Sequence, residues 1–190
     1  MTTQHSFLPQ HLGKYLLSLF VITVALATNP AQAASKVEID AYVSEALKKF
    51  YKTSAAGKNL ASRAKGMLIF PRVYKAGIGI GGEYGEGALR IGGTNVAYYS
   101  TASASIGFQL GAQRKAQLIL FMTSDALSTF RNSDGWEAGV DGSVAIATFG
   151  AGGDIDTKTA QKPIIGFIIS NEGLMYNLSL EGSKITQLQR

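Results

Sequence analysis

The spacing of apolar residues changes along the chain. From Val37 to Lys52, apolar side chains recur every three or four residues, which is the period of an amphipathic helix. The apolar positions of this helix are Ile39, Val43, Ala46, Leu47, Phe50 and Tyr51. A second, shorter helix is predicted over Lys58–Lys65, ending at Gly66.

Beyond Gly66 the sequence has the pattern of strands. The continuous apolar run Gln117–Thr123 is typical of a strand covered on both faces. After it, Ser124 is placed to cap one helical turn that reaches Phe130. Further strands are predicted over Met67–Phe70, closed by Pro71, over Ala138–Ala147, and in a hairpin of Ile164–Ser170 and Leu174–Leu180 around Gly173.

These elements predict an α+β fold that is mostly β. Short strands, many glycines and few prolines favour a curled antiparallel sheet or partial barrel, fronted by the N-terminal amphipathic helices. The folded part is expected to be one domain, with a basic helical segment over residues 34–66 and a β-rich core over residues 67–190.

The stretch from Lys75 to Leu89 is rich in glycine, at positions 77, 79, 81, 82, 85 and 87. Glycine weakens a strand, so such a run indicates bends or the close approach of another backbone. The residues between the glycines alternate as in a strand, which predicts a sharply bent β-hairpin. Three of the glycines also fit the spacing of a dinucleotide-binding loop. That motif needs a helix after it and an acidic residue about 20 positions on, and the sequence has neither.

The first 33 residues have the features of an export signal. Lys14 precedes an apolar run from Tyr15 to Ala27, and Ala31-Gln-Ala33 forms a small-x-small cleavage site. The run is shorter than the ~20 residues of a membrane-spanning helix. No cysteine is present to carry a lipid or a disulfide. We therefore expect cleavage after Ala33 and a periplasmic protein, free or peripheral to a membrane.

Cleavage there would leave a chain without histidine or cysteine, because both histidines precede Ala33. His-based triads, cysteine nucleophiles and the usual zinc sites are thereby excluded. Glu83 and Glu86 are three apart on a strand, so they point to opposite faces and do not suit an acid/base pair. Asp154 and Asp156 share a face but lack the further oxygens that calcium prefers. No catalytic residue, no metal and no cofactor is expected.

Basic residues are concentrated at the start of the mature chain. Residues 36–75 contain nine basic and three acidic side chains, whereas residues 76–190 contain eight basic and ten acidic ones. This asymmetry favours an anionic partner, such as a membrane surface. The candidate lipid-binding residues are Lys48, Lys49, Phe50, Lys52, Lys58, Arg63, Lys65, Arg72 and Lys75. An equally good interpretation is that the apolar stripe packs on the β-core and the lysines only keep the helix hydrated.

One long segment, residues 66–89, reads GMLIFPRVYKAGIGIGGEYGEGAL. It resembles the signature of the SYLF domain, a phospholipid-binding domain found in bacteria and in eukaryotic actin-patch proteins. Further similarities follow in the family's order at residues 104–113, 126–130, 135–136, 141–145, 163–164 and 180–184. The resemblance implies a phospholipid ligand. Actin is not an expected partner in the compartment of an exported bacterial protein, and no nucleic acid partner is expected.

Aromatic residues of the β-region are candidates to line a cavity for an acyl chain. They are Tyr98, Tyr99, Phe108 and Phe149, with small residues nearby leaving room; tight sheet packing explains the small residues equally well. The leading hypothesis is a periplasmic, non-catalytic protein that recognises anionic phospholipid through its basic N-terminal segment. The alternatives are a scaffold that binds another envelope protein or polymer and, least favoured, a carboxylate-only hydrolase.

Overall fold

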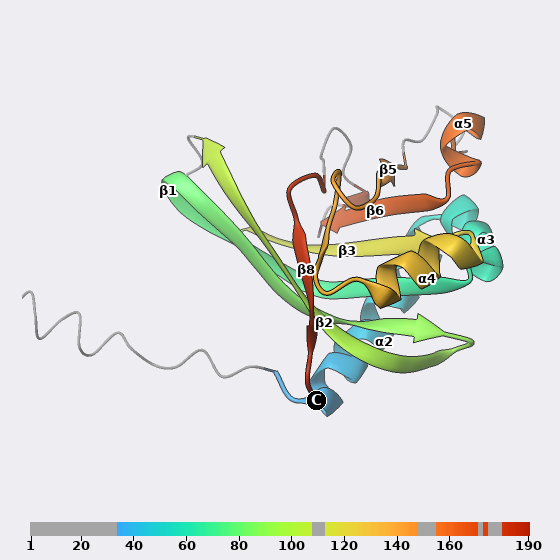
Figure 1. The fold of residues 1–190 in the computed structure, drawn as a ribbon, viewed down its shortest axis with the longest axis horizontal. Coiled ribbons are helices and arrows are strands. Elements are labelled where there is room, and N and C mark those ends of the chain that lie inside the picture. Colours follow the sequence, from blue (N-terminus) through green and yellow to red (C-terminus); the bar gives the residue numbers. More distant parts are fainter. Residues whose placement is uncertain (1–33, 108–112, 148–154, 171–172, 175–179) are drawn as a thin grey trace, which may run out of the picture. The chain divides into compact units, whose positions relative to one another are not determined.

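Strand β1 (Gly66–Ile91) is the longest element, and the sheet is arranged around it (Figure 1). The computed structural model describes residues 34–107, 113–147, 155–170, 173–174 and 180–190. The helices are α2 (Lys36–Thr53), α3 (Ala55–Arg63), α4 (Ser124–Asn132) and α5 (Thr157–Ala160). The other strands are β2 (Thr94–Gly107), β3 (Gln113–Phe121), β4 (Trp136–Glu137), β5 (Ala145–Ile146), β6 (Ile164–Ser170), β7 (Gly173–Leu174) and β8 (Lys184–Leu188).

The strands form one sheet in the order β4-β8-β2-β1-β3-β6-β5, with β7 paired to β6. The sheet is curled into a half-barrel, so the predicted mostly β fold with N-terminal helices is confirmed. It is mixed rather than purely antiparallel, because β5 runs parallel to β6. The connection between these two strands contains α5 and is long enough to bring the chain back to the same end of the sheet.

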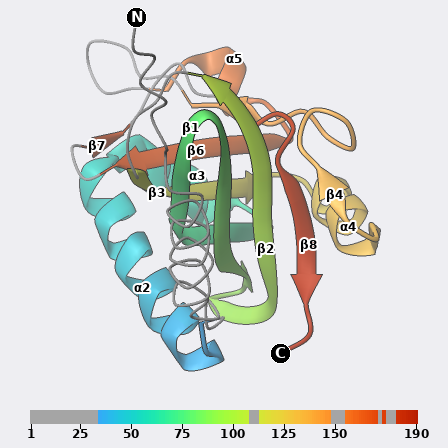
Figure 2. The same cartoon turned by 90° about the vertical axis from the view of Figure 1, so that its left-hand side faces the viewer.

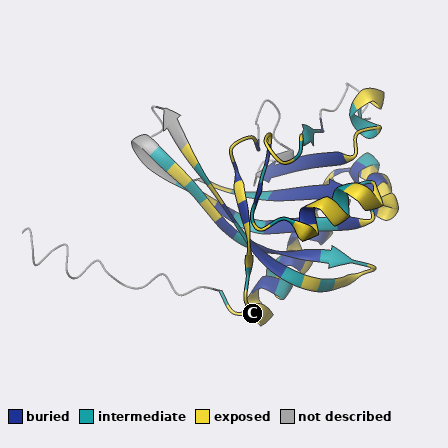
Figure 3. Ribbon diagram, in the orientation of Figure 1, coloured by how far each residue is buried: buried dark blue, intermediate teal, exposed yellow. Residues whose placement is uncertain are grey.

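The sheet buries apolar side chains on both faces, in two clusters (Figure 3). Along β3, Leu118 and Leu120 join the cluster that α2 and α3 cover. Ile119 and Phe121 join the other cluster, which includes Phe130 of α4. The apolar run of β3 is therefore covered on both faces, as its sequence predicts.

Two strand predictions are wrong in their limits. The strand predicted to close at Pro71 continues through it, because a register shift between Phe70 and Val73 leaves Pro71 without a ladder partner on β3. The strand predicted over residues 138–147 is mostly a turn, with Gly139 at φ 92° between the short strands β4 and β5. The predicted hairpin is present where it is described, but Gly173 lies in β7, paired to Ser170, and not in the loop.

Helices α2 and α3 meet at Ser54. At the other end of α2, Ser35 and Glu38 form a reciprocal capping box, which lowers the pKa of Glu38 through its hydrogen bonds to Ser35. Ser54 ends α2, and its hydroxyl accepts a 2.8 Å hydrogen bond from the backbone N–H of Gly57. That cap is why α3 begins at Ala55, three residues before the predicted Lys58.

Strand β1 turns back on itself, as Figure 2 shows. Its first half, Gly66–Lys75, pairs with β3, and its second half, Gly79–Ile91, pairs with β2. The halves touch: a Cβ at Gly87 would lie 2.0 Å from the carbonyl oxygen of Ile69, and one at Gly85 would lie 2.7 Å from that of Arg72. The close backbone approach that the glycines predict is thus made within a single strand.

Helix α2 is fixed to the sheet through Asp40. Its Oδ1 accepts hydrogen bonds from the Tyr98 hydroxyl (2.8 Å) and from Asn95 Nδ2 (2.7 Å) of β2. Arg90 donates to Oδ1 of Asn95 at 3.0 Å. Burial, together with the hydrogen bond to Asp40 and its negative charge, raises the pKa of Tyr98 to about 12. Tyr98 is therefore an anchor for the helix.

We expect Tyr98→Phe to lower the free energy of unfolding by about 1.5–3 kcal/mol, because the substitution removes a hydrogen bond to a carboxylate. Urea denaturation measures this loss. Tyr99→Phe is the matched control, since Tyr99 is as deeply buried and its hydroxyl has no hydrogen-bond partner among the described residues. Equal losses in the two variants would contradict the anchoring role.

The raised pKa of Tyr98 also predicts a loss of folding stability at alkaline pH. A tyrosine pKa that is raised on folding adds stability below its ordinary value of 10.0, and this stability is lost as the pH rises toward the folded value of about 12. The stability of the parent should therefore fall more steeply over this range than that of Tyr98→Phe.

Candidate functional site

The basic residues of the N-terminal segment fall into three groups. Lys48, Lys49 and Lys52 are exposed on α2, and Lys58 and Arg63 are exposed on α3. Lys65 is exposed just before β1. The remaining two candidates, Arg72 and Lys75, lie within β1.

Arg72 and Lys75 are engaged by the protein itself. The Arg72 guanidinium lies 3.3 Å from the ring centroid of Tyr42 on α2. Lys75 Nζ is 3.7 Å from a carboxylate oxygen of Glu83, which also pairs with Lys115 at 2.7 Å. These two cations are therefore less available to a ligand than those on the helices.

The apolar stripe of α2 packs on the sheet. Ile39, Val43 and Phe50 are at most 1% exposed. The Phe50 ring meets that of Phe167 edge to face, with centroids 4.8 Å apart. Phe50 was a lipid-binding candidate, but in this fold it lies in the core and reaches no surface. The interpretation in which the stripe packs on the β-core is the one the structure shows, and α2 presents a mainly polar face on which Val37 is also exposed.

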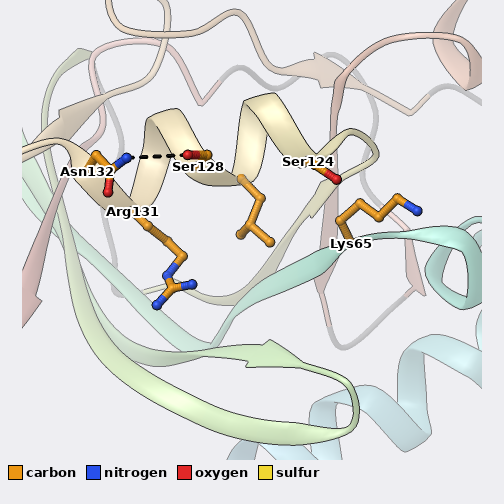
Figure 4. A pocket seen from close by; sticks show the side chains of 6 residues that line it. Lys65, Ser124, Ser128, Arg131 and Asn132 are labelled. Carbon is orange, nitrogen blue, oxygen red and sulfur yellow. Dashed lines mark hydrogen bonds between the residues drawn. The ribbon is translucent and has the colours of Figure 1, made fainter.

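Lys65 lines a groove of about 470 Å³ beside α4 (Figure 4). The other lining residues all belong to α4; they are Ser124, Leu127, Ser128, Arg131 and Asn132. In the view of Figure 4, Lys65 lies at one end of the groove and Arg131 toward the other. Ser128 accepts a 3.3 Å hydrogen bond from Asn132 Nδ2.

The chemistry of this groove suits an anion. Two cations, two hydroxyls and an amide line it, and no carboxylate is among the lining residues. Among the described residues, neither Lys65 nor Arg131 forms an ion pair. Phosphate oxygens accept hydrogen bonds from such groups. The groove can thus hold a phosphate-bearing group, with Leu127 as apolar floor.

Sequence reasoning found only Lys65 of this groove. The four polar residues of α4 that line the groove recur at spacings of three and four, as one face of a helix requires. The helix itself was predicted, with Ser124 as its cap. In the structure Thr123 is the N-cap, accepting from the N–H of Ala126 at 3.2 Å, and Ser124 is the first helical residue. The Ser124 side chain therefore does not cap the helix and lines the groove instead.

The candidate cavity residues do not share one face of the sheet. Tyr98 and Tyr99 are both buried, but Tyr98 belongs to the cluster beneath α2 and Tyr99 to the cluster with Phe130. Phe108 and Phe149 lie outside the described residues. An acyl-chain cavity therefore stays a prediction.

The carboxylates considered for catalysis or cation binding have structural partners. Glu83 pairs with two lysines, and Glu86 pairs with Arg190 at 2.8 Å. Asp156 caps α5 by accepting from the N–H of Thr159, and this lowers its pKa. Asp154 lies outside the described residues. In the described part of the chain, no three His, Cys, Asp or Glu side chains are grouped to hold a metal.

None of the described helices is long and apolar enough to cross a membrane. Residues 102–190 match the family model described as "Ysc84: Las17-binding protein actin regulator", which is the SYLF domain. The match begins in β2 and includes α4 and its groove residues, whereas the glycine-rich segment 66–89 precedes it. No curated protein matches the chain. The family predicted from the sequence is confirmed over this range: residues 102–190 match the SYLF (Ysc84) domain model.

Proposed function

We propose that this protein is exported to the periplasm and binds anionic phospholipid there, without catalysing a reaction. Family membership supports a lipid- or protein-binding role in general. The observation that favours an anionic lipid is the exposure of the helical lysines, Lys48, Lys49, Lys52 and Lys58, in a segment with few acidic residues. The ion pairs of Glu83 and Glu86 favour a structural role for these carboxylates over a catalytic one.

The strength of the contact limits how it works. Each lysine near an anionic surface contributes about 1 kcal/mol, so four contribute ~4 kcal/mol. That free energy corresponds to a Kd of about 1 mM. All of the apolar stripe of α2 except Tyr51 is buried, so the stripe adds little to membrane binding. Charge on the helices therefore draws the protein to a membrane but does not hold it there.

The groove beside α4 supplies the missing contact. A charge-assisted hydrogen bond contributes about 1.5–3 kcal/mol. One such bond from Lys65 or Arg131 to a headgroup phosphate brings the affinity toward about 10 μM. Arg63 ends α3 two residues before Lys65, so the exposed cations of the helices lead directly to the groove. In this arrangement the helices attract the membrane and the groove holds one headgroup.

Vesicle sedimentation tests the proposal. The parent should bind phosphatidylglycerol vesicles and not phosphatidylcholine vesicles, and its binding should weaken as salt screens the surface. The double variant Lys65→Gln, Arg131→Gln should bind phosphatidylglycerol about tenfold more weakly than the parent. The control is the double variant Lys158→Gln, Lys162→Gln, which changes two exposed lysines elsewhere and should bind more nearly like the parent. Equal binding of the parent to both vesicle types, without salt dependence, would overturn the anionic-lipid function.

A protein-binding scaffold is the second candidate, because the family description names binding to the protein Las17. Export would separate this chain from actin, so its partner would be another envelope component. This alternative would be favoured if the parent bound neither kind of vesicle but retained one envelope protein after detergent extraction.

A further inference from the structure

The side chain of Glu86 joins three separated parts of the fold. Its Oε1 accepts hydrogen bonds from the Tyr84 hydroxyl (2.9 Å) and from Arg190 (2.8 Å), the last residue of the sequence. Its Oε2 accepts from the backbone N–H of Ala34 at 3.2 Å. Arg190 also donates to the carbonyl oxygen of Ala34. Glu86 and Arg190 thus hold the residue that leads into α2.

Ala34 is also the residue that follows the predicted cleavage site. We propose that Glu86 is the binding site for the α-ammonium group that cleavage between Ala33 and Ala34 creates. This inference rests on the proposed export of the chain. A peptidase of the envelope hydrolyses the Ala33–Ala34 peptide bond: the hydroxyl of water goes to the Ala33 carbonyl carbon. The Ala34 nitrogen takes the remaining proton of the water molecule and the proton released by the new Ala33 carboxyl group, and so becomes an ammonium group.

The new group strengthens a contact that is already in place. In the uncleaved chain, Ala34 offers Glu86 one neutral N–H donor. After cleavage the same nitrogen carries a positive charge and three donors, so an ion pair is added to a hydrogen bond whose acceptor is already ionised. The Glu86 side chain is only 10% exposed, so solvent screens this pair less than one on the open surface.

The new ammonium group lies beside the N-terminus of α2 and therefore needs the negative charge of Glu86 next to it. Ala34 directly precedes Ser35, the N-cap of α2. The N-terminus of a helix carries partial positive charge, so an ammonium group beside it is unfavourable. Glu86 from β1 and Glu38 of the capping box are the carboxylates at this point, and Arg190 adds a further positive charge. Without Glu86, cleavage would place two cations against the positive end of α2 with Glu38 as the remaining carboxylate.

The experiment compares two forms of the full chain, each exported through its own leader. One is the parent, and the other carries Gly-Ser inserted between Ala33 and Ala34, which moves the α-amine about 7 Å along the chain. Glu86→Gln is made in both. Glu83→Gln is the matched control, because Glu83 lies on the same strand with a similarly buried side chain and two lysine partners. Intact mass identifies the first residue of each product, and thermal unfolding gives Tm.

The parent should begin at Ala34 and the second form at the inserted Gly. With Glu86 intact, the inserted form should melt about 2–4 °C lower than the parent. Glu86→Gln should lower Tm by about 2–4 °C more in the parent than in the inserted form, whereas Glu83→Gln should lower Tm equally in both.

The outcomes separate the two proposals. A parent that retains residues before Ala34 would overturn both export with cleavage at this site and the ammonium site. A parent that begins at Ala34, but shows the same effect of Glu86→Gln in both forms and the same Tm as the inserted form, would overturn the ammonium site alone.

Discussion

Gly87→Ala should lower the free energy of unfolding by about 3 kcal/mol. The added Cβ would lie 2.0 Å from the carbonyl oxygen of Ile69 and 2.8 Å from its carbonyl carbon, both of them backbone atoms. Ile69 is paired with Leu118 of β3 and is fully buried, so it cannot move away without disturbing the ladder and the core. Overpacking of this kind costs typically 1–3 kcal/mol, and the backbone contact places this site at the upper end.

Gly82→Ala is the matched control for that substitution. Gly82 lies in the same strand, is exposed, and a Cβ there would come no closer than 3.6 Å to a backbone oxygen. Its unfolding free energy should change by less than about 0.5 kcal/mol. Urea denaturation of the two variants side by side measures the difference. If Gly87→Ala were as stable as Gly82→Ala, the halves of β1 would not be in the contact described.

Replacing Lys48, Lys49 and Lys52 together by Gln should weaken binding to phosphatidylglycerol vesicles by about 2–3 kcal/mol, or roughly 30- to 150-fold. Each of these side chains is exposed on α2 and contributes about 1 kcal/mol near an anionic surface. The free energy of unfolding should change by less than about 0.5 kcal/mol, because exposed charges contribute little to folding. Vesicle sedimentation and urea denaturation measure the two quantities.

The control for the α2 lysines removes the same charge elsewhere. Lys158, Lys162 and Lys184 are also exposed, but they lie in α5, in the turn after it, and in β8. Their joint replacement by Gln lowers the net charge equally and should weaken binding much less. If both triple variants lost affinity to the same extent, net charge and not the face of α2 would explain the attraction.

Local patterns in the sequence predicted α2, α4 and the two-sided burial of β3, because each depends on residues close together in the chain. The glycines of β1 indicated a close approach, but their partner, the carbonyl oxygen of Ile69, is defined only when the strand turns back. Pro71 misled the strand prediction, since a proline costs no ladder bond at a bulge. Phe50 was assigned to lipid because periodicity shows that a stripe is apolar without showing what covers it.

The candidate site was predicted only in part for the same reason. Lys65 was found through the charge of its segment, whereas Arg131 lies far along the chain in a region that is not basic overall. Only the fold brings α4 beside the start of β1. Spacings on a helix can suggest a polar face, but they do not tell which other residue completes a groove.

Strand β1 supplies side chains to both apolar clusters, Ile69 and Ala88 to one, Leu68, Phe70 and Leu89 to the other. Its two halves also hold β3 and β2 in the same sheet. Opening either half therefore exposes both clusters to water and frees the ladder to one neighbouring strand. The amide hydrogens of β2 and β3 should then exchange through one common unfolding event, with neither edge of the central sheet opening ahead of the other.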